Sequence, residues 1–271
     1  DRAEVRRCIL DRITIVGMGP LGASIGLALK KARLSNLEIV GTSGNRKALS
    51  AATKIGAVDS TTGNLRSAVE SADLVILDSH LAETEDLLEA IGAIVPDGCV
   101  ITDTTTTKVQ VLEWADQHLP DHVSFVGGRP LPKELPTKVE DADPSIFEGT
   151  EYCIIPAKSA ESGAIGTIVS LVERLRAKPL FLDAHEHDSY AAAMTYLPIV
   201  MSSAYVTATA GSEGWREMHR LAGPEFMGIS QLAANEPRDS SVASLAVSDA
   251  LGHWIDQVTA EDGKIDLFLI V

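Results

Sequence analysis

The sequence predicts an α/β protein in which a Rossmann-type parallel sheet is followed by an all-helical part. Short apolar runs rich in Val and Ile alternate with amphipathic helical patterns as far as residue 183. After residue 183 the helical periodicity continues with almost no strand signal. A glycine-rich turn also joins the first apolar run to the first helix. We therefore expect a sheet domain over residues 1–183 and a helical domain over residues 184–271.

Apolar runs of three or four residues mark the strands, because a parallel strand is buried on both faces of its sheet. The expected strands are 13–16, 38–41, 74–77, 99–102, 123–126, 152–155 and 180–182. Apolar residues recur at helical spacing over 21–29, 47–55, 83–94, 109–118 and 165–176. In the second part, helices are expected over 191–209, 215–221 and 242–258. The Pro-rich, charged stretch 130–144 is expected to form a long surface loop.

The charge balance argues against several classes of function. The chain has 23 Lys and Arg against 38 Asp and Glu, a formal net charge of −15. Nucleic acids and anionic membranes select clustered cations, so neither is an expected partner. The three cysteines form no CxxC pair, no residue cluster has metal-ligand spacing, and no apolar run approaches the roughly 20 residues of a membrane helix. With a charged start and no apolar leader, the expected location is the cytoplasm.

The sequence GMGPLG at 17–22 fits the GxGxxG pattern of a dinucleotide site. Gly17 permits the tight turn, Gly19 lets a pyrophosphate approach the backbone, and Gly22 lets the helix pack on the strand. The N–H groups at the helix start then bind phosphate. The alternative is an ordinary glycine turn, but the strand–turn–helix context favours a cofactor. The expected cofactor-binding residues of this turn are Gly17, Gly19, Pro20, Leu21 and Gly22.

The end of the second strand indicates which nicotinamide cofactor is bound. An NAD site places Asp or Glu there to accept from the ribose 2′-hydroxyl. This chain has Thr42, Ser43, Asn45 and Arg46 instead, with donors for a 2′-phosphate and no carboxylate to repel it. The alternative is a solvated polar turn. The pattern favours NADP.

Further motifs carry a resemblance to a known family. After the glycine turn come TDTTTTK at 102–108, GGRP at 127–130, EHD at 186–188 and TYLP at 195–198. Their order and spacing resemble prephenate and arogenate dehydrogenases over nearly the whole chain. The resemblance implies an enzyme of tyrosine-type aromatic biosynthesis that oxidises a cyclohexadienyl ring, passing hydride to the nicotinamide with loss of carbon dioxide. It also implies a homodimer paired through the helical domain, which is rich in Ala, Leu, Val and Met.

The chain departs from the family where the substrate chemistry lies. Arg129 stands where the family has the His that accepts the hydroxyl proton, and Thr106 replaces a serine. The segment 195–199 lacks both family histidines, and Gln231 replaces the arginine that binds the substrate carboxylate. A guanidinium cannot act as a base at neutral pH, but it can bind a carboxylate through two hydrogen bonds. We therefore expect a small anionic substrate and a rewritten substrate pocket.

Each remaining candidate has a functional and a structural interpretation. His80 is either a replacement acid or base, or a helix cap. Tyr196 is either a proton donor or a core aromatic. Thr106 and Lys108 match family positions, although a threonine run is also typical of a strand end. The candidate catalytic residues are thus Arg129, Thr106, Tyr196 and His80, and the candidate substrate ligands are Arg129, Gln231 and Lys108.

Two classes of function follow from these residues. The first is an NADP-dependent oxidoreductase whose substrate is prephenate, arogenate, the 4-amino analogue 4-amino-4-deoxyprephenate, or an unrelated small carbonyl or imine compound. The second is a catalytically silent protein that binds NADP or a metabolite. Turnover of a candidate substrate, as against cofactor binding without turnover, separates the two.

Overall fold

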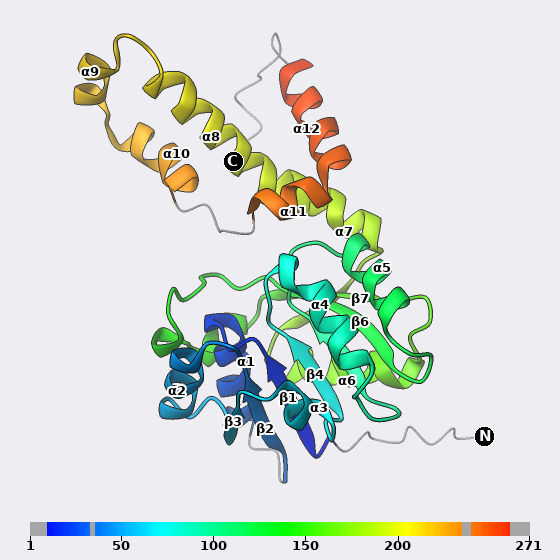
Figure 1. Cartoon of the computed structure of the whole chain (residues 1–271). Helices are drawn as coiled ribbons and strands as arrows, with labels where there is room; N and C mark the ends of the chain where they lie inside the picture. Colours follow the sequence, from blue (N-terminus) through cyan, green and yellow to red (C-terminus); the bar gives the residue numbers. More distant parts are fainter. Residues whose placement is uncertain (1–9, 33–35, 235–239, 261–271) are drawn as a thin grey trace. The chain divides into compact units, whose positions relative to one another are not determined.

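The structure, a computed structural model, describes residues 10–32, 36–234 and 240–260 (Figure 1). The chain divides into two compact units, Asp1–Ala184 and His185–Val271. We describe each unit by itself. Cys8 lies outside the described residues.

The N-terminal unit is built on one eight-stranded sheet with the strand order β3-β2-β1-β4-β5-β6-β7-β8. The first six strands in this order are parallel, β7 runs antiparallel to β6, and β8 is parallel to β7. The strands are β1 (Arg12–Val16), β2 (Glu38–Thr42), β3 (Ser60–Thr62), β4 (Leu74–Leu77), β5 (Val100–Asp103), β6 (Ser124–Pro130), β7 (Glu151–Pro156) and β8 (Lys178–Phe181). The expected Rossmann-type sheet is confirmed, with β3 as an additional edge strand.

Helices cover both faces of this sheet (Figure 1). They are α1 (Pro20–Lys31), α2 (Arg46–Lys54), α3 (Leu65–Val69), α4 (Leu81–Gly92), α5 (Val109–His118) and α6 (Ser162–Arg174). Apolar side chains of α1, α2 and α6 form one core cluster with fully buried strand residues such as Ile13, Ile15 and Ile76. The stretch 130–144, expected to be a surface loop, contains the short 3-10 turn η1 (Val139–Asp141), whose Val139 is buried, and ends where a second turn, η2 (Pro144–Phe147), begins.

Residues in the sequence of α1 explain where this helix begins and how closely it packs. Pro20 occupies the first turn, where its missing N–H costs nothing, and Lys30 and Lys31 lie in the last turn, near the negative end of the helix dipole. A Cβ on Gly26 would lie 2.3 Å from the Ala57 carbonyl oxygen, so only glycine permits this contact. Because β1 and β4 are neighbours, the loops after them open at the carboxyl edge where the strand order reverses.

The C-terminal unit is helical in its described residues, which confirms the predicted change of structure. It contains α7 (Ala184–Ala191), the π-helical turn η3 (Ala192–Tyr196), α8 (Leu197–Ala210), α9 (Trp215–Met218), the 3-10 turn η4 (His219–Leu221), α10 (Pro224–Ala234), α11 (Ser240–Ala246) and α12 (Ser248–Ala260). Ser202 on α8 ties this helix to α10, since its hydroxyl donates to the Ile229 carbonyl at 2.6 Å and accepts from the Ala233 N–H at 2.9 Å. Helix α10 is an addition to the helices expected from the sequence.

Apolar residues of this second unit lie largely on its surface. On α8 the one buried residue is Ser202. Met194 is 76% exposed, Leu221 85% and Leu245 74%. Among the described residues, the continuous helical stretch Ala184–Ala210 has the length and hydropathy of a membrane span, and 28% of its most apolar window is buried. Length and composition alone do not distinguish such a span from a helix that packs against protein.

Candidate active site

The glycine turn after β1 has the tight geometry that its sequence predicts. Gly17 has φ +85°, and its N–H donates to the Thr42 carbonyl at 2.8 Å. A Cβ at Gly17 would lie 2.1 Å from the Asp78 carbonyl oxygen, where β4 ends. Only glycine fits both this backbone conformation and this close approach. The turn and α1 thus have the shape of a phosphate-binding site.

The side chain of Asp78 accepts hydrogen bonds from backbone N–H groups of this turn. Its Oδ2 accepts from the N–H groups of Gly19 at 3.0 Å and Gly22 at 2.8 Å. Its Oδ1 accepts from the Thr104 hydroxyl at 3.1 Å. A Cβ on Gly22 would lie 2.5 Å from Oδ2, so the third glycine of the motif accommodates a carboxylate of the chain itself. Sequence reasoning missed Asp78, although a carboxylate directly after β4 at the switch point was the available signal.

Burial changes the acidity of this carboxyl group. Loss of solvation raises the pKa of Asp78 to about 6, against the lowering effect of hydrogen bonds from Gly22, Thr104 and Gly19 and of the nearby His80. The pKa of Asp78 therefore lies above the usual range of an aspartate carboxyl group.

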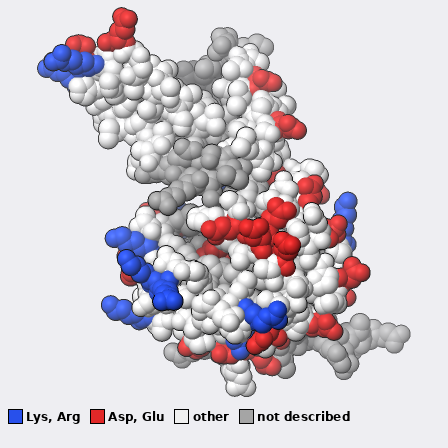
Figure 2. Space-filling model, in the orientation of Figure 1, with Lys and Arg blue, Asp and Glu red and all other residues white. Residues whose placement is uncertain are grey.

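The predicted cofactor residues after β2 form one compact turn. Asn45 is the N-cap of α2, where its Oδ1 accepts from the N–H groups of Lys47 at 3.1 Å and Ala48 at 3.2 Å. The Ser43 hydroxyl oxygen accepts from the Asn45 N–H at 3.1 Å. Arg46 begins the helix and is exposed. In Figure 2, Lys and Arg side chains gather over the region of α2 and Asp and Glu side chains over that of α4.

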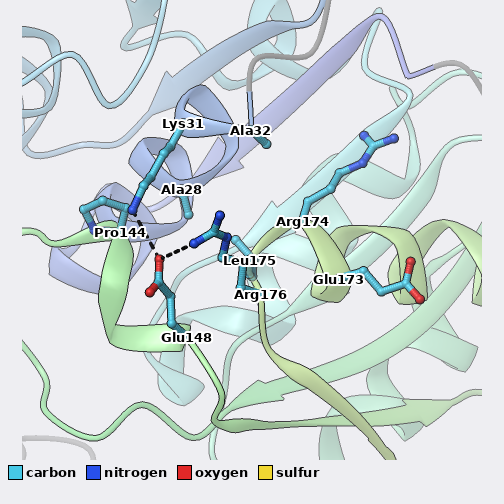
Figure 3. A pocket seen from close by; sticks show the side chains of 9 residues that line it. All are labelled: Ala28, Lys31, Ala32, Pro144, Glu148, Glu173, Arg174, Leu175 and Arg176. Atoms are coloured by element: carbon cyan, nitrogen blue, oxygen red, sulfur yellow. Dashed lines mark hydrogen bonds and ion pairs between the residues drawn. The ribbon is translucent and has the colours of Figure 1, made fainter.

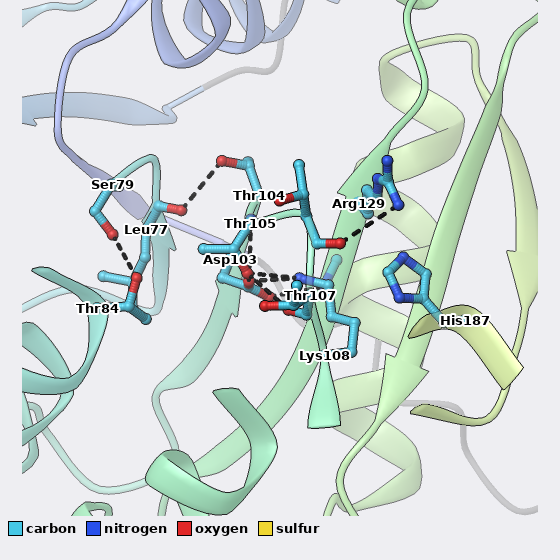
Figure 4. Close-up of polar contacts among 12 residues, drawn as sticks. Leu77, Ser79, Thr84, Asp103, Thr104, Thr105, Thr107, Lys108, Arg129 and His187 are labelled. Carbon is cyan, nitrogen blue, oxygen red and sulfur yellow. Dashed lines mark hydrogen bonds and ion pairs between the residues drawn. The ribbon is translucent and has the colours of Figure 1, made fainter. Parts of the chain in front are cut away.

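A buried ion pair lies at the end of β5. Lys108 and Asp103 are both fully buried, and Nζ lies 2.5 Å from Oδ2 (Figure 4). The Thr105 hydroxyl donates to the same carboxylate oxygen, and the Gly128 N–H donates to Oδ1 at 3.0 Å. The Lys108 ammonium is thus held by the chain's own carboxylate. Its predicted role as a substrate ligand stays a prediction.

Arg129 and Thr106, both candidate catalytic residues, are in contact with each other. An Nη of Arg129 donates to the Thr106 carbonyl at 3.4 Å (Figure 4). The arginine is 9% exposed and pairs in register with Cys153 on β7. Burial raises the pKa of the Cys153 thiol, and the cations of Arg129 and Lys108 oppose this shift. The site therefore presents a guanidinium, and not an imidazole, at the end of β6.

The other candidates are spread over both units. His80 is exposed where β4 leads into α4, and its carbonyl accepts from the Glu83 N–H at 2.9 Å. In the C-terminal unit, Tyr196 ends the π-helical turn and is 3% exposed, while Gln231 is exposed on α10. His187 on α7 is buried, with Nδ1 2.8 Å from an Asp188 oxygen.

A cleft elsewhere in the N-terminal unit has different chemistry. It encloses about 290 Å³ between the last turn of α1 and the end of α6 (Figure 3). Glu148 in its wall pairs with Lys31 at 3.2 Å and Arg176 at 3.3 Å, and both cations lower the pKa of this carboxyl group. Because both cations are already paired with Glu148 on an exposed surface, the cleft is a poor candidate for a ligand site.

Fold and glycine turn together define a Rossmann-type nucleotide-binding protein. The family model for the prephenate dehydrogenase nucleotide-binding domain matches residues 25–180. The chain belongs to the prephenate dehydrogenase family, which confirms the resemblance found in its motifs.

Individual relatives agree with this assignment. The chain is 28% identical to the prephenate dehydrogenase of Bacillus subtilis over 254 residues, covering 92% of this chain and 68% of that protein. It is 32% identical to the prephenate dehydrogenase of Lactococcus lactis over 244 residues, covering 89% and 63% respectively. The chain therefore spans about two thirds of the length of these curated relatives.

Solved structures show the same fold at lower identity. The Aquifex aeolicus prephenate dehydrogenase bound to hydroxyphenyl propionate and NAD+ aligns with a TM-score of 0.85 at 19% identity, over 93% of this chain and 87% of that one. Synechocystis arogenate dehydrogenase aligns with a TM-score of 0.78 at 21% identity, over 92% and 88%.

Proposed function

We propose that this chain is an NADP-dependent dehydrogenase of a small anionic ring compound, with Arg129 as a ligand of the substrate carboxylate. The observation that carries the proposal is the place of Arg129: a buried guanidinium at the end of a sheet strand, beside Thr106. Membership of the prephenate dehydrogenase family supports the reaction class.

The N-terminal unit supplies the residues that would hold the cofactor. The glycine turn at 17–22 leads directly into α1, and the backbone N–H groups at the start of this helix are the donors that would bind a pyrophosphate. Ser43, Asn45 and Arg46 would meet a 2′-phosphate, in a turn that lacks a carboxylate. The bound nicotinamide would accept the hydride from the substrate. The NAD+ in the A. aeolicus structure supports a nicotinamide cofactor, and the turn after β2 supports NADP.

The substrate class follows from the charge of Arg129. A guanidinium stays protonated at neutral pH, binds a carboxylate through two parallel hydrogen bonds and stabilises negative charge that develops beside it. It cannot accept the proton of a ring hydroxyl. Prephenate, arogenate and 4-amino-4-deoxyprephenate all carry a carboxylate, and an amino group on the ring needs different proton handling from a hydroxyl.

The second candidate function is cofactor or metabolite binding without turnover. Arg129 also favours this function, because it removes the family's proton acceptor from the end of β6. The two candidates share the same ligand contacts and differ only in whether hydride moves.

We also propose that the protein is a homodimer paired through its helical unit. Met194, Leu221, Leu245 and Met227 are large apolar side chains that are 61–85% exposed, and exposed apolar side chains of this kind are common at protein–protein contacts. A second copy of the chain would bury this surface.

The test combines binding and turnover. Calorimetry with NADP+ and NAD+ measures cofactor binding, and NADPH absorbance measures turnover of prephenate, arogenate and the 4-amino analogue. Arg129→Lys, which keeps the charge, should retain part of the carboxylate binding, and Arg129→Ala should lose it. Binding of both ligands without NADPH formation from any substrate would favour the silent protein.

A further inference from the structure

We propose that Asp78 is a proton-controlled competitor of the cofactor pyrophosphate, so that the dinucleotide binds together with one proton taken up by this carboxyl group. The inference rests on the proposed function, since it assumes that the glycine turn binds a dinucleotide. It adds a residue of this chain that sets how tightly that cofactor is held.

The first step is geometric. Asp78 Oδ2 accepts from two N–H groups at the start of α1, that of the N-cap Gly19 at 3.0 Å and that of Gly22 in the first turn at 2.8 Å. The helix start attracts anions through such donors and through its dipole. A carboxylate bound there satisfies both attractions. It therefore takes the electrostatic place of a phosphate in the turn.

The second step concerns charge. The first turn of α1 carries no acidic residue, and its basic residues lie in the last turn, so the helix itself does not offset two anions at its start. An ionised Asp78 beside a pyrophosphate would put like charges together in a partly buried site, where screening by water is weak. Protonation removes this repulsion and provides an O–H that can donate to a phosphate oxygen.

Several polar and titratable groups face Asp78 from neighbouring elements. The Thr104 hydroxyl, in the loop after β5, donates a hydrogen bond to Asp78. The electrostatic interaction with His80, at the start of α4, lowers the pKa of Asp78. Burial raises the pKa of Tyr152 on β7, and the charge of Asp78 raises it further. Across β5, Asp103 is engaged by Lys108. Asp78 contacts the N–H groups of the glycine turn directly, and burial raises its pKa to about 6, so it is the carboxyl group that takes up the proton.

The experiment measures binding of NAD+ by isothermal titration calorimetry at several pH values between about 6 and 8. NAD+ is the probe because it lacks the 2′-phosphate, whose own second pKa lies near 6. Titration in two buffers of different ionisation enthalpy gives the number of protons taken up. We expect uptake approaching one proton above the pKa of Asp78 and a Kd that rises about tenfold per pH unit there.

Asp78→Asn keeps an oxygen for the two glycine N–H groups and removes the titration. It should bind NAD+ more tightly than the wild type at pH 8, with no proton uptake. The matched control is Asp73→Asn at the other end of β4, where Oδ2 likewise accepts from two backbone N–H groups, those of Asp11 and Arg12, each at 2.8 Å. This control should retain the wild-type pH dependence.

Three outcomes are distinguishable. Proton uptake in the wild type and in Asp73→Asn, lost in Asp78→Asn, supports the proposal. Equal affinity and equal proton uptake in wild type and Asp78→Asn would overturn it and leave the proposed function standing. Absence of NAD+ and NADP+ binding in every variant across the pH range would overturn both.

Discussion

The two units of this chain differ in how far their large apolar side chains are buried. In the N-terminal unit, strands such as β4 are buried along their whole length, and helices pack over both faces of the sheet. In the C-terminal unit, α8 has one buried residue, Ser202, and large apolar side chains such as Met194 face outward. The first unit therefore has a large buried core, whereas the second leaves many of its large apolar side chains exposed.

The candidate residues divide in the same way. The cofactor turn, Asp78 and the turn after β2 belong to the N-terminal unit, as do Arg129 and Thr106. Tyr196 and Gln231 belong to the C-terminal unit. The candidate cofactor residues thus all belong to the first unit, while the candidate catalytic and substrate residues are divided between the two.

The largest expected effect is on the buried ion pair of the N-terminal unit. Lys108→Ala leaves the Asp103 carboxylate buried without its cation, which should lower the free energy of unfolding by about 3–5 kcal/mol. Lys30→Ala removes the partner of Asp59 in a partly exposed pair and should cost at most about 1 kcal/mol. Urea unfolding of both variants measures the difference. Equal losses would contradict the buried character of the first pair.

The next effect tests the surface of the C-terminal unit. Met227→Glu changes a side chain that is 61% exposed, so in an isolated monomer it should alter stability by no more than about 0.5 kcal/mol. At a helical dimer interface the same change buries an unpaired charge and should cost several-fold more, shifting the protein to monomers. Light scattering of wild type and variant at micromolar concentration checks this. A wild type that is already monomeric would remove the proposed dimer.

A pH-dependent effect is expected at Asp78 even without cofactor. Because burial raises its pKa to about 6 from the ordinary value of 3.8, folding favours the protonated form. The associated stabilisation is full below the unfolded pKa and is lost as the pH rises through about 6. Asp78→Asn should therefore gain stability over the wild type between pH 4 and pH 7, by about 1–3 kcal/mol. Thermal unfolding of both proteins across this range measures it, and a constant difference would contradict the raised pKa.

The last expected effect concerns cofactor preference. Arg46→Ala should reduce the preference for NADP+ over NAD+ by about 1–3 kcal/mol, the scale of a charge-assisted phosphate contact. Lys54→Ala, at the far end of α2, is the matched control and should change the preference little. Calorimetric dissociation constants for both cofactors decide the matter. Equal constants in the wild type would contradict the preference itself.

Local patterns predicted the fold well, and tertiary contacts explain what they missed. The continuous apolar runs of β1 and β4 specify buried parallel strands, and the glycine turn identifies the start of α1. Strand β3 escaped prediction because Ser60–Thr62 is polar and lies at the sheet edge. The sequence of α10 is interrupted by Gly228, which weakens a helical pattern.

Within the candidate site, motifs identified the elements but not their partners. The turn after β2 was predicted from residue types alone. Asp78 was not, because its contact with Gly19 and Gly22 depends on how closely β4 approaches α1. Lys108 was assigned to substrate, and the structure pairs it with Asp103, five positions earlier in the chain.

The central claim is that the cofactor half of the family's machinery is retained and the substrate half is changed. The direct test is NADPH formation with prephenate by the wild type, Arg129→His, and Arg129→His combined with Gln231→Arg. We expect negligible turnover by the first two, since the single variant still lacks a cation at residue 231, and measurable turnover by the double variant, which has both a base and a carboxylate anchor. Robust prephenate oxidation by the wild type would contradict the claim and would point to His80 or Tyr196 as the proton acceptor.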